Sequence, residues 1–344
     1  MIGVFALEDP LRPGVREAVA DCVRAGVRVK MCTGDNVLTA RSIAEQCGIL
    51  NQDGLVMEGP DFRVLSDTER LSIVSRLQVL ARSSPEDKRV LVNTLKALGE
   101  IVGVTGDGTN DGPALKAAHV GFSMGLTGTE VAKEASDIVL MDDNFASIVQ
   151  AIVWGRAVHD AVRKFLQFQV TPTFAAVVVT LVSALASART DGSVLGAVQL
   201  LWVAIVIDTF AALALATDPA SPALLARAPE RRDAPLFTVD MLKQIVGQSA
   251  YQVVVVLVFH FLGDHILGLP AGDRRTDTLV FNTFVFAQIF NSFNCRRLDR
   301  ALNIFEGIHR NPYFIGVTGL GTFVSVCNLC MLTRPPSQKS PFRP

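Results

Sequence analysis

The sequence predicts an α/β domain built on a parallel sheet, followed by an all-α bundle of membrane-spanning helices. Strand-like and helix-like segments alternate from Ile2 to about Met141, which is typical of a parallel sheet with helices on both faces. Apolar residues concentrate after Phe165, in segments close to the roughly 20 residues that cross a bilayer. A run of glycine, aspartate and asparagine at residues 101–115 predicts a site at the edge of the sheet.

The composition favours a membrane protein and excludes some classes of partner. Of the 344 residues, 49% are hydrophobic and the mean hydropathy is +0.36, both high for a soluble protein. The net charge is −1, so no overall positive field favours a nucleic-acid partner. The six cysteines are scattered, which indicates reduced thiols rather than a disulfide framework. The first residues carry no basic flank or cleavage site, so we expect no signal peptide.

The first strand-to-helix turn of the sheet domain carries groups that suit phosphate. We expect a strand over Ile2–Leu7, a helix over Val15–Ala25, a strand over Val27–Met31 and a helix over Leu38–Cys47. Between the last two stand a hydroxyl, a glycine amide and a carboxylate: Thr33, Gly34 and Asp35. Such a turn suits a phosphate, and its repetition as Thr105–Asp107 is unexpected by chance.

The run from residue 101 to residue 115 contains the densest set of oxygen ligands. Its first four residues form a short apolar strand, and a helix follows its last glycine. A strand that ends in aspartate before a helix is a usual place for phosphate and a hard cation. Asp107 stands where it can hold magnesium, and Asn110 and Asp111 can complete the shell or orient a water. The alternative is a tight turn with two solvated aspartates.

The rest of the sheet domain offers one further phosphate ligand. Ser84 can cap a helix with Pro85 at its first position. Lys88 lies one turn into that helix, where it either reaches a phosphate or stays solvated. The remaining elements expected here are a helix, a strand, a helix and a strand: Asp67–Leu77, Val120–Met124, Glu130–Ala135 and Asp137–Met141.

After the sheet domain we expect a stalk helix and five membrane spans. The sheet domain covers residues 1–144, the stalk 145–168, the spans 169–332 and a tail 333–344. The spans lie at about 170–188, 194–216, 245–262, 278–293 and 313–332, and Pro172 breaks the first. Arginines in the loops after the second and fourth spans place the sheet domain on the cytoplasmic side. The tail then lies opposite, and a sixth span would restore the charge rule.

Polar residues within the spans predict an ion site. Asp208 stands in the middle of the second span, where a carboxylate is costly unless it meets a cation or a partner. The alternative is a neutral aspartic acid. Beside Pro172, the hydroxyls of Thr171 and Thr173 and the freed carbonyls can add ligands. Amides of the fourth span offer further oxygens or hold helices together: Asn282, Gln288 and Asn291.

With these residues in view, the chain resembles the P-type cation-transporting ATPases, specifically the plasma-membrane-type calcium pumps. The motifs that carry the resemblance cover nearly the whole chain, and the run Thr105–Leu115 is highly specific. They lie at residues 8–13, 31–36, 81–88, 104–115, 164–169, 208–217 and 303–308. The resemblance implies a haloacid-dehalogenase-like phosphorylation domain followed by the C-terminal membrane helices, from the family's fifth onward.

The resemblance also implies ligands, cofactors and a membrane. It implies ATP as substrate, Mg²⁺ as cofactor and Ca²⁺ as the transported ion, in a plasma or vacuolar membrane. For the phosphoryl group it implies contacts from Thr33, Gly34, Asp35 and Lys88. For magnesium it implies Asp107 and Asp111, supported by Asn110, and for calcium it implies Asp208 with Thr173.

Three departures from the family shape the functional expectation. The family's phosphorylated aspartate lies in an Asp-Lys-Thr-Gly-Thr run, which this sequence does not contain. Thr173 and Ala204 stand where the family usually has asparagine. We therefore expect the C-terminal part of a calcium pump, inactive alone and active with its missing N-terminal half. The alternative is a truncated membrane protein that pairs with or regulates an intact pump. A free-standing phosphatase is disfavoured, because Asp9, the early strand-end acid, precedes a proline.

Overall fold

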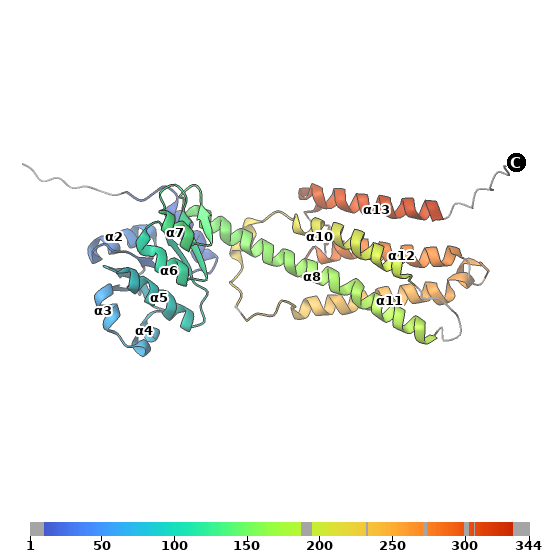
Figure 1. Cartoon of the computed structure of the whole chain (residues 1–344), viewed down its shortest axis with the longest axis horizontal. Helices are drawn as coiled ribbons and strands as arrows, with labels where there is room; N and C mark the ends of the chain where they lie inside the picture. The colour runs from blue at the N-terminus through green and yellow to red at the C-terminus, as the bar shows by residue number, and fades with distance from the viewer. Residues whose placement is uncertain are drawn as a thin grey trace, which may run out of the picture. The chain divides into compact units, whose positions relative to one another are not determined.

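The computed structural model describes residues 10–186, 195–231, 233–270, 274–298, 303–305 and 307–332 (Figure 1). The chain divides into two compact units. The α/β unit comprises residues 1–155 and 221–234, and the helical unit comprises residues 156–220 and 235–344. The strand expected at Ile2–Leu7 and the tail 333–344 lie outside the described residues.

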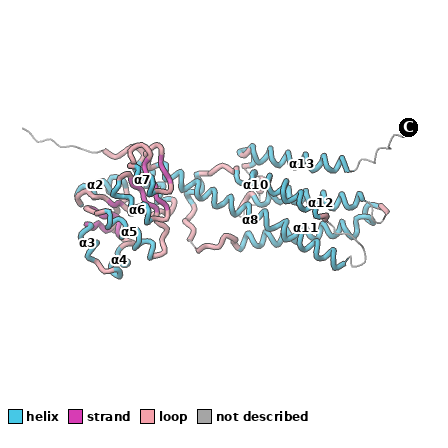
Figure 2. Tube along the Cα trace, viewed as in Figure 1, coloured by secondary structure: helices cyan, strands magenta, loops and turns pink. Residues whose placement is uncertain are grey.

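The strands of the α/β unit form two parallel sheets (Figure 2). The first has the order β1-β3-β2 and the second β4-β5-β6, and every described pairing is parallel. The bounds are β1 Met31–Cys32, β2 Leu55–Glu58, β3 Leu77–Ala81, β4 Gly103–Gly106, β5 Val120–Met124 and β6 Ile138–Leu140. Helices alternate with these strands, which confirms the predicted α/β class, with the strands paired in two sets of three.

Some helices of this unit start at residues whose side chains cap them. Asn36 accepts a hydrogen bond from the Thr39 amide before α2, and Ser84 accepts one from the Asp87 amide before α5. Such side chains satisfy amides that have no partner within the helix. The bounds are α1 Val15–Arg24, α2 Val37–Cys47, α3 Gly59–Val64, α4 Asp67–Ile73, α5 Pro85–Ala97, α6 Gly112–Ala117 and α7 Glu130–Ala135.

Strand β3 is the centre of the first sheet because apolar residues cover both of its faces. Leu80 packs in a cluster with Phe62 and Leu91, while Val79 packs with Ala40 and Ala44 of α2. Strands buried on both faces read as continuous apolar runs, and Leu77–Ala81 is such a run. The sheet therefore fixes where β3 ends, next to the residues that start α5.

Two expected elements are shorter than the sequence pattern indicated. The strand expected over Val27–Met31 pairs only from Met31, because β3 starts at Leu77 and its register places Met31 opposite Val79. The helix expected over Asp67–Leu77 ends at Ile73. Leu77 has instead become the first residue of β3, where its side chain is buried with the sheet core.

The helical unit contains long apolar helices, and the α/β unit gives way to it within helix α8. The bounds are α8 Ala146–Ala186, α9 Ala197–Trp202, α10 Asp208–Ala216, α11 Val239–Leu267, α12 Arg274–Cys295 and α13 Pro312–Leu332. Three described stretches are long and apolar enough to cross a membrane: Ala146–Ala186, Val198–Ala216 and Val239–Leu267. Helix α13 adds a shorter apolar stretch, Pro312–Cys327.

Pro172 does not end its helix, contrary to the expected break. Helix α8 is continuous over Ala146–Ala186 with the proline inside it. Proline has no N–H to donate to the carbonyl four residues earlier, so the carbonyl of Phe168 loses its helical partner. On either side of the proline, the hydroxyls of Thr171 and Thr173 bond carbonyls of their own helix at 2.8 Å.

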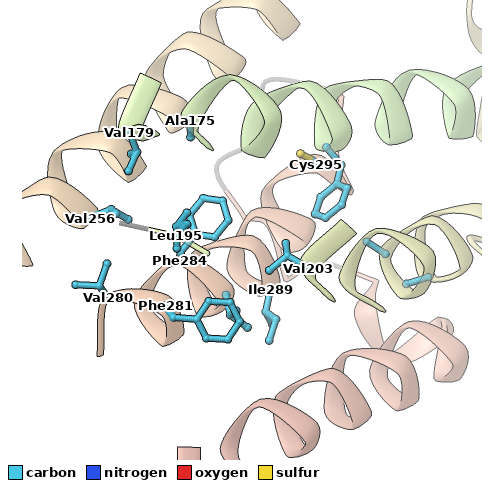
Figure 3. Packing of buried hydrophobic residues seen from close by; sticks show 14 of the residues in the cluster. Ala175, Val179, Leu195, Val203, Val256, Val280, Phe281, Phe284, Ile289 and Cys295 are labelled. Atoms are coloured by element: carbon cyan, nitrogen blue, oxygen red, sulfur yellow. The ribbon is translucent and has the colours of Figure 1, made fainter. Parts of the chain in front are cut away.

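Among the described residues of the helical unit, most helices contribute to one large apolar cluster (Figure 3). Helix α12 contributes the aromatic centre, including Phe281 and Phe284, and α8 contributes Ala175 and Val179. Trp202 packs edge-on against Phe281 with ring centroids 6.1 Å apart. Residues of α8 and α12 are thus buried in the same apolar cluster.

Candidate functional site: a phosphate and magnesium pocket at the carboxyl ends of the strands

The carboxyl ends of the two sheets meet through an ion pair between Lys88 and Asp111. Lys88 lies in the first turn of α5, which follows β3, and its Nζ donates to Asp111 Oδ1 at 2.7 Å. Asp111 lies in the short helical turn after β4. Both side chains are largely shielded from solvent. Two residues that the sequence predicted separately, one for phosphate and one for magnesium, are therefore brought into one place.

The predicted phosphate turn follows β1 and is held by backbone contacts to β3. Thr33 donates its amide to the Leu80 carbonyl at 3.0 Å, and its own carbonyl accepts from Ser83 at 2.9 Å. The Thr33 hydroxyl donates to the Asp35 carboxylate at 2.9 Å. Gly34 and Asp35 are exposed. The turn is rigid at its base and open at its tip, as a pocket for an outside anion requires.

The acidic side of the pocket follows β4. Asp111 folds back on its own loop, and a Cβ added to Gly106 would lie only 2.4 Å from the Asp111 Cβ. The glycine is needed for this close approach. Asp107 and Asn110 are exposed at the same loop, and the Asp107 carbonyl accepts from the Thr129 amide at 2.9 Å. Asp107 and Asp111 thus lie on one short loop beside Lys88.

Sequence reasoning missed the ion pair that positions Lys88. Asp87 is 1% exposed and receives two hydrogen bonds from Arg63, at 2.9 and 2.8 Å. The Ser84 amide and hydroxyl also donate to it, each at 2.8 Å. Burial opposes ionisation of Asp87, but the bonds from Arg63 and Ser84 outweigh it and hold the pKa of this carboxyl below its ordinary value. The capping pattern Ser-x-x-Asp was a visible signal, whereas Arg63 was not.

Cys32 lines the same region. Its thiol lies 3.4 Å from the Ser83 hydroxyl, and burial raises the pKa of the thiol above its ordinary value. The cysteine therefore stays protonated and packs as a small apolar residue against the core of the first sheet.

The pocket matches the way proteins hold magnesium with a phosphate. Magnesium is usually bound by one or two carboxylates together with substrate oxygens and waters. Asp107 and Asp111 supply two carboxylates on one loop. Across the described ranges, no three histidine, cysteine or acidic side chains gather into a closed metal site. The donor set fits an open magnesium site that a phosphate completes.

The predicted ion site lies around an irregular turn of helix. The residues Val203–Ile207 form a π-helical turn, and Asp208 is the first residue of α10 directly after it. Such turns loosen the backbone bonding of a helix and are frequent at functional sites. The side chain of Asp208 lies outside the described side chains. Thr173 is exposed, and its hydroxyl is bonded to the Gln169 carbonyl.

A second feature that the sequence did not reveal is the polar cluster around Asp218, just after α10. Its carboxylate accepts from Lys164 of α8 at 2.7 Å and from Asn311 at 2.9 Å. Arg296, which follows α12, lies 3.5 Å away and also stacks 5.7 Å over the Phe314 ring. Burial opposes ionisation, yet Lys164 and the other donors hold the pKa of Asp218 below its ordinary value. One carboxylate thus links α8 with the ends of α10 and α12 and the start of α13.

Two family models match separate parts of the chain, the first within the α/β unit and the second mostly within the helical unit. Residues 1–119 match the haloacid dehalogenase-like hydrolases, and residues 192–338 match the C-terminus of cation-transporting ATPases. A haloacid dehalogenase-like sheet domain followed by cation-ATPase helices defines the class of P-type cation transporters.

Individual relatives narrow this class. The chain is 65% identical over 318 residues to calcium-transporting ATPase 2 of Cryptococcus neoformans, covering 92% of the chain and 22% of that relative. It is 51% identical to calcium-transporting ATPase PAT1 of Dictyostelium discoideum, covering 92% of the chain and 31% of the relative. It is 49% identical to calcium-transporting ATPase 7, plasma membrane-type, of rice, covering 97% and 32%.

The chain belongs to the P-type calcium-transporting ATPases, and it is a multi-pass membrane protein. It spans about a quarter to a third of the length of the curated relatives it matches. Both the family resemblance and the fold class predicted from the sequence are thereby confirmed.

Proposed function

We propose that this chain supplies the phosphoryl-transfer pocket and part of the calcium path of an ATP-driven calcium pump. The contact between Lys88 and Asp111 is the observation that carries the proposal. It joins the carboxyl ends of two parallel sheets, which is where open α/β sheets bind phosphate-containing ligands. Calcium-transporting ATPases are among the proteins to which the chain is similar.

In this proposal each pocket residue has a separate task. The Gly34 amide and the Thr33 hydroxyl bind phosphoryl oxygens, and Lys88 provides a positive charge beside them. Asp107 and Asp111 hold Mg²⁺, which neutralises charge that develops during phosphoryl transfer. The ion pair of the buried Asp87 with the exposed Arg63 keeps the start of α5 in place, so that Lys88 points at the phosphate.

The nucleophile of the reaction comes from outside these 344 residues. The sequence contains no Asp-Lys-Thr-Gly-Thr run. Within the described strands, β1 pairs with β3 and β4 pairs with β5, so each is an edge strand. Edge strands present unpaired amides and carbonyls to a further strand. A strand that ends in the nucleophilic aspartate and adds to either edge delivers that aspartate to the pocket.

The calcium path in this proposal uses Asp208 and Thr173, in helices that the bilayer surrounds. The π-helical turn before Asp208 frees backbone carbonyls, and Ca²⁺ takes 6–8 oxygen ligands. Ligands from helices outside this chain therefore complete the site. Helix α8 carries motion from the phosphorylation domain to this site. The α/β unit is cytoplasmic, and the membrane is the plasma or the vacuolar membrane.

A second candidate function follows from the missing motif. A chain that folds but cannot form a phosphoenzyme would act as a non-catalytic partner or regulator of an intact pump. The two functions predict different results for phosphoenzyme formation when the chain is expressed together with the missing segment.

The test is phosphoenzyme formation from γ-labelled ATP in membranes. We expect no acid-stable phosphoenzyme with the chain alone, and a calcium-dependent one when a segment carrying Asp-Lys-Thr-Gly-Thr is co-expressed. Asp107→Asn should abolish it, whereas Asp53→Asn, at an exposed turn, should not. An aspartyl phosphate on the chain alone would refute the proposal. Binding to an intact pump without phosphorylation would support the second function.

A further inference from the structure

Three buried amides between helices α11 and α12 have polar atoms that the described protein does not satisfy. Gln252 of α11 is 2% exposed, and Gln288 and Asn291 of α12 are 0% and 1% exposed. Gln288 donates from Nε2 to Gln252 Oε1 at 3.1 Å. Gln252 Nε2, Gln288 Oε1 and Asn291 Nδ2 have no hydrogen-bond partner among the described residues. Leaving such atoms unpaired in an apolar interior is costly.

The apolar surroundings of these amides shield them from bulk solvent. Phe284 and Ile289 of α12 and Val256 of α11 belong to the apolar core of the unit (Figure 3). Ser249, nearly one turn before Gln252, donates to the Thr171 carbonyl of α8 at 3.1 Å. Ser249 and Gln252, three residues apart, lie on the face of α11 directed toward the proline turn of α8, and the burial of all three amides places them inside the bundle.

Rearranging the amides does not remove the problem. The oxygen and nitrogen of an amide are assigned from their hydrogen bonds. Exchanging them in both Gln252 and Gln288 preserves one bond between the helices and still leaves one donor and one acceptor unpaired. Asn291 adds a further donor one turn along α12. A polar ligand is needed in every arrangement.

The chemistry of the unpaired atoms identifies that ligand. Two of them are N–H₂ donors and one is a carbonyl acceptor. Every arrangement of the two glutamines leaves one N–H₂ donor unpaired, and a cation would face that donor with like polarity, so a cation does not satisfy the site. Water both donates and accepts, and buried waters typically make about three hydrogen bonds to such groups. We propose that Gln252, Gln288 and Asn291 form an internal water site between α11 and α12.

Cys295 offers a reporter next to the site. Its thiol lies 3.7 Å from the Asn291 Oδ1, and the residue is 1% exposed. Cys22, which is 2% exposed in the α/β unit, is a matched cysteine of similar burial. Hydroxyl radicals produced by an X-ray pulse arise at bound waters as well as in bulk, so a buried thiol beside a bound water is oxidised while a dry one is not.

The experiment is radiolytic footprinting of the chain in lipid nanodiscs. We expect Cys295 to be oxidised several-fold faster than Cys22. Asn291→Leu and Gln288→Leu should each reduce the Cys295 rate to that of Cys22. Asn282→Leu, which removes an amide bonded within α12, should leave it unchanged. The melting temperature of each variant shows whether it is folded.

Two results would overturn the proposal. The first is an oxidation rate of Cys295 in the unsubstituted chain no higher than that of Cys22, which would mean that no water is bound between α11 and α12. The second is a fast Cys295 rate that persists in folded Asn291→Leu and Gln288→Leu, which would mean oxidation from bulk water at the end of α12. The water site does not depend on calcium transport or on phosphorylation.

Discussion

The ammonium of Lys88 and the carboxylate of Asp111 lie 2.7 Å apart, although the two residues are 23 positions apart in the sequence with strand β4 between them. Both side chains are shielded from solvent, with exposed fractions of 18% for Lys88 and 14% for Asp111. It places a positive charge directly beside the proposed magnesium loop. We expect a bound phosphoryl group to replace Asp111 as the partner of Lys88, and magnesium to replace Lys88 as the partner of Asp111.

Removing the ammonium should slow phosphorylation in the complemented pump. We expect Lys88→Ala to reduce the rate of phosphoenzyme formation by roughly 10²–10³, the effect of deleting one preorganised charge-stabilising group. Lys96→Ala, which removes a lysine of the same helix bonded to the Ala117 carbonyl, is the control. Rapid-quench measurement of the labelled phosphoenzyme checks this. Equal rates for the two variants would remove Lys88 from the pocket.

Removing the buried carboxylate of Asp87, which anchors the start of α5, should destabilise the α/β unit. We expect Asp87→Ala to cost about 2 kcal/mol, because it breaks the capping box with Ser84 and removes the buried acceptor of the bonds from Ser84 and Arg63. Glu86→Ala, which removes the adjacent acid of an exposed pair with Arg89, should cost much less. Urea unfolding of the whole chain followed at the α/β unit measures both. Similar losses would show that Asp87 contributes no more than a surface acid.

The lowered pKa of Asp87 predicts acid sensitivity of defined sign. A carboxyl whose folded-state pKa is depressed stabilises the fold above its unfolded value, about 3.9, and this stabilisation is lost as pH falls through the folded value. Stability should therefore fall below about pH 4 more steeply in the unsubstituted chain than in Asp87→Asn. Urea midpoints from pH 6 downward test this. Parallel pH profiles would contradict it.

The Asp218 cluster should matter for the stability of the helical unit. We expect Asp218→Ala to destabilise it by about 3 kcal/mol, since the change leaves Lys164 and Arg296 shielded without their shared carboxylate. Asp233→Ala, at an exposed turn of the same loop, should have little effect. Thermal unfolding in detergent is the measurement. A loss of stability no larger than that of the control would show that the cluster makes no net contribution to the stability of the helical unit.

Local chemistry made part of this molecule predictable, and long-range contacts did not. The turns at Thr33 and Asp107 were visible because each follows a short apolar strand, and the start of α5 was visible because Ser84 and Pro85 are helix-start residues. The partner of Asp87 is 24 residues away on a different helix, with no periodic signal. Gln288 was recognised as polar, but its partner Gln252 lies 36 residues earlier.

The same distinction explains the errors in the elements. Hydrophobic pattern alone extended a strand over Val27–Met31, whereas pairing begins only where β3 offers a neighbour. Local propensity placed a break at Pro172, whereas α8 continues through it, with Phe168 and Ala175 on either side buried in the core. Tertiary contacts overrode local preference in both cases.

ATP-driven calcium uptake into sealed vesicles tests most directly whether the phosphate pocket and Asp208 belong to one pump. The chain is co-expressed with the segment that carries the nucleophile, and uptake of labelled calcium is compared for Asp107→Asn, Asp208→Asn and Asp53→Asn. We expect uptake in the unsubstituted protein and in Asp53→Asn, and its loss in the other two. Uptake that survives both Asp107→Asn and Asp208→Asn would contradict the proposed coupling.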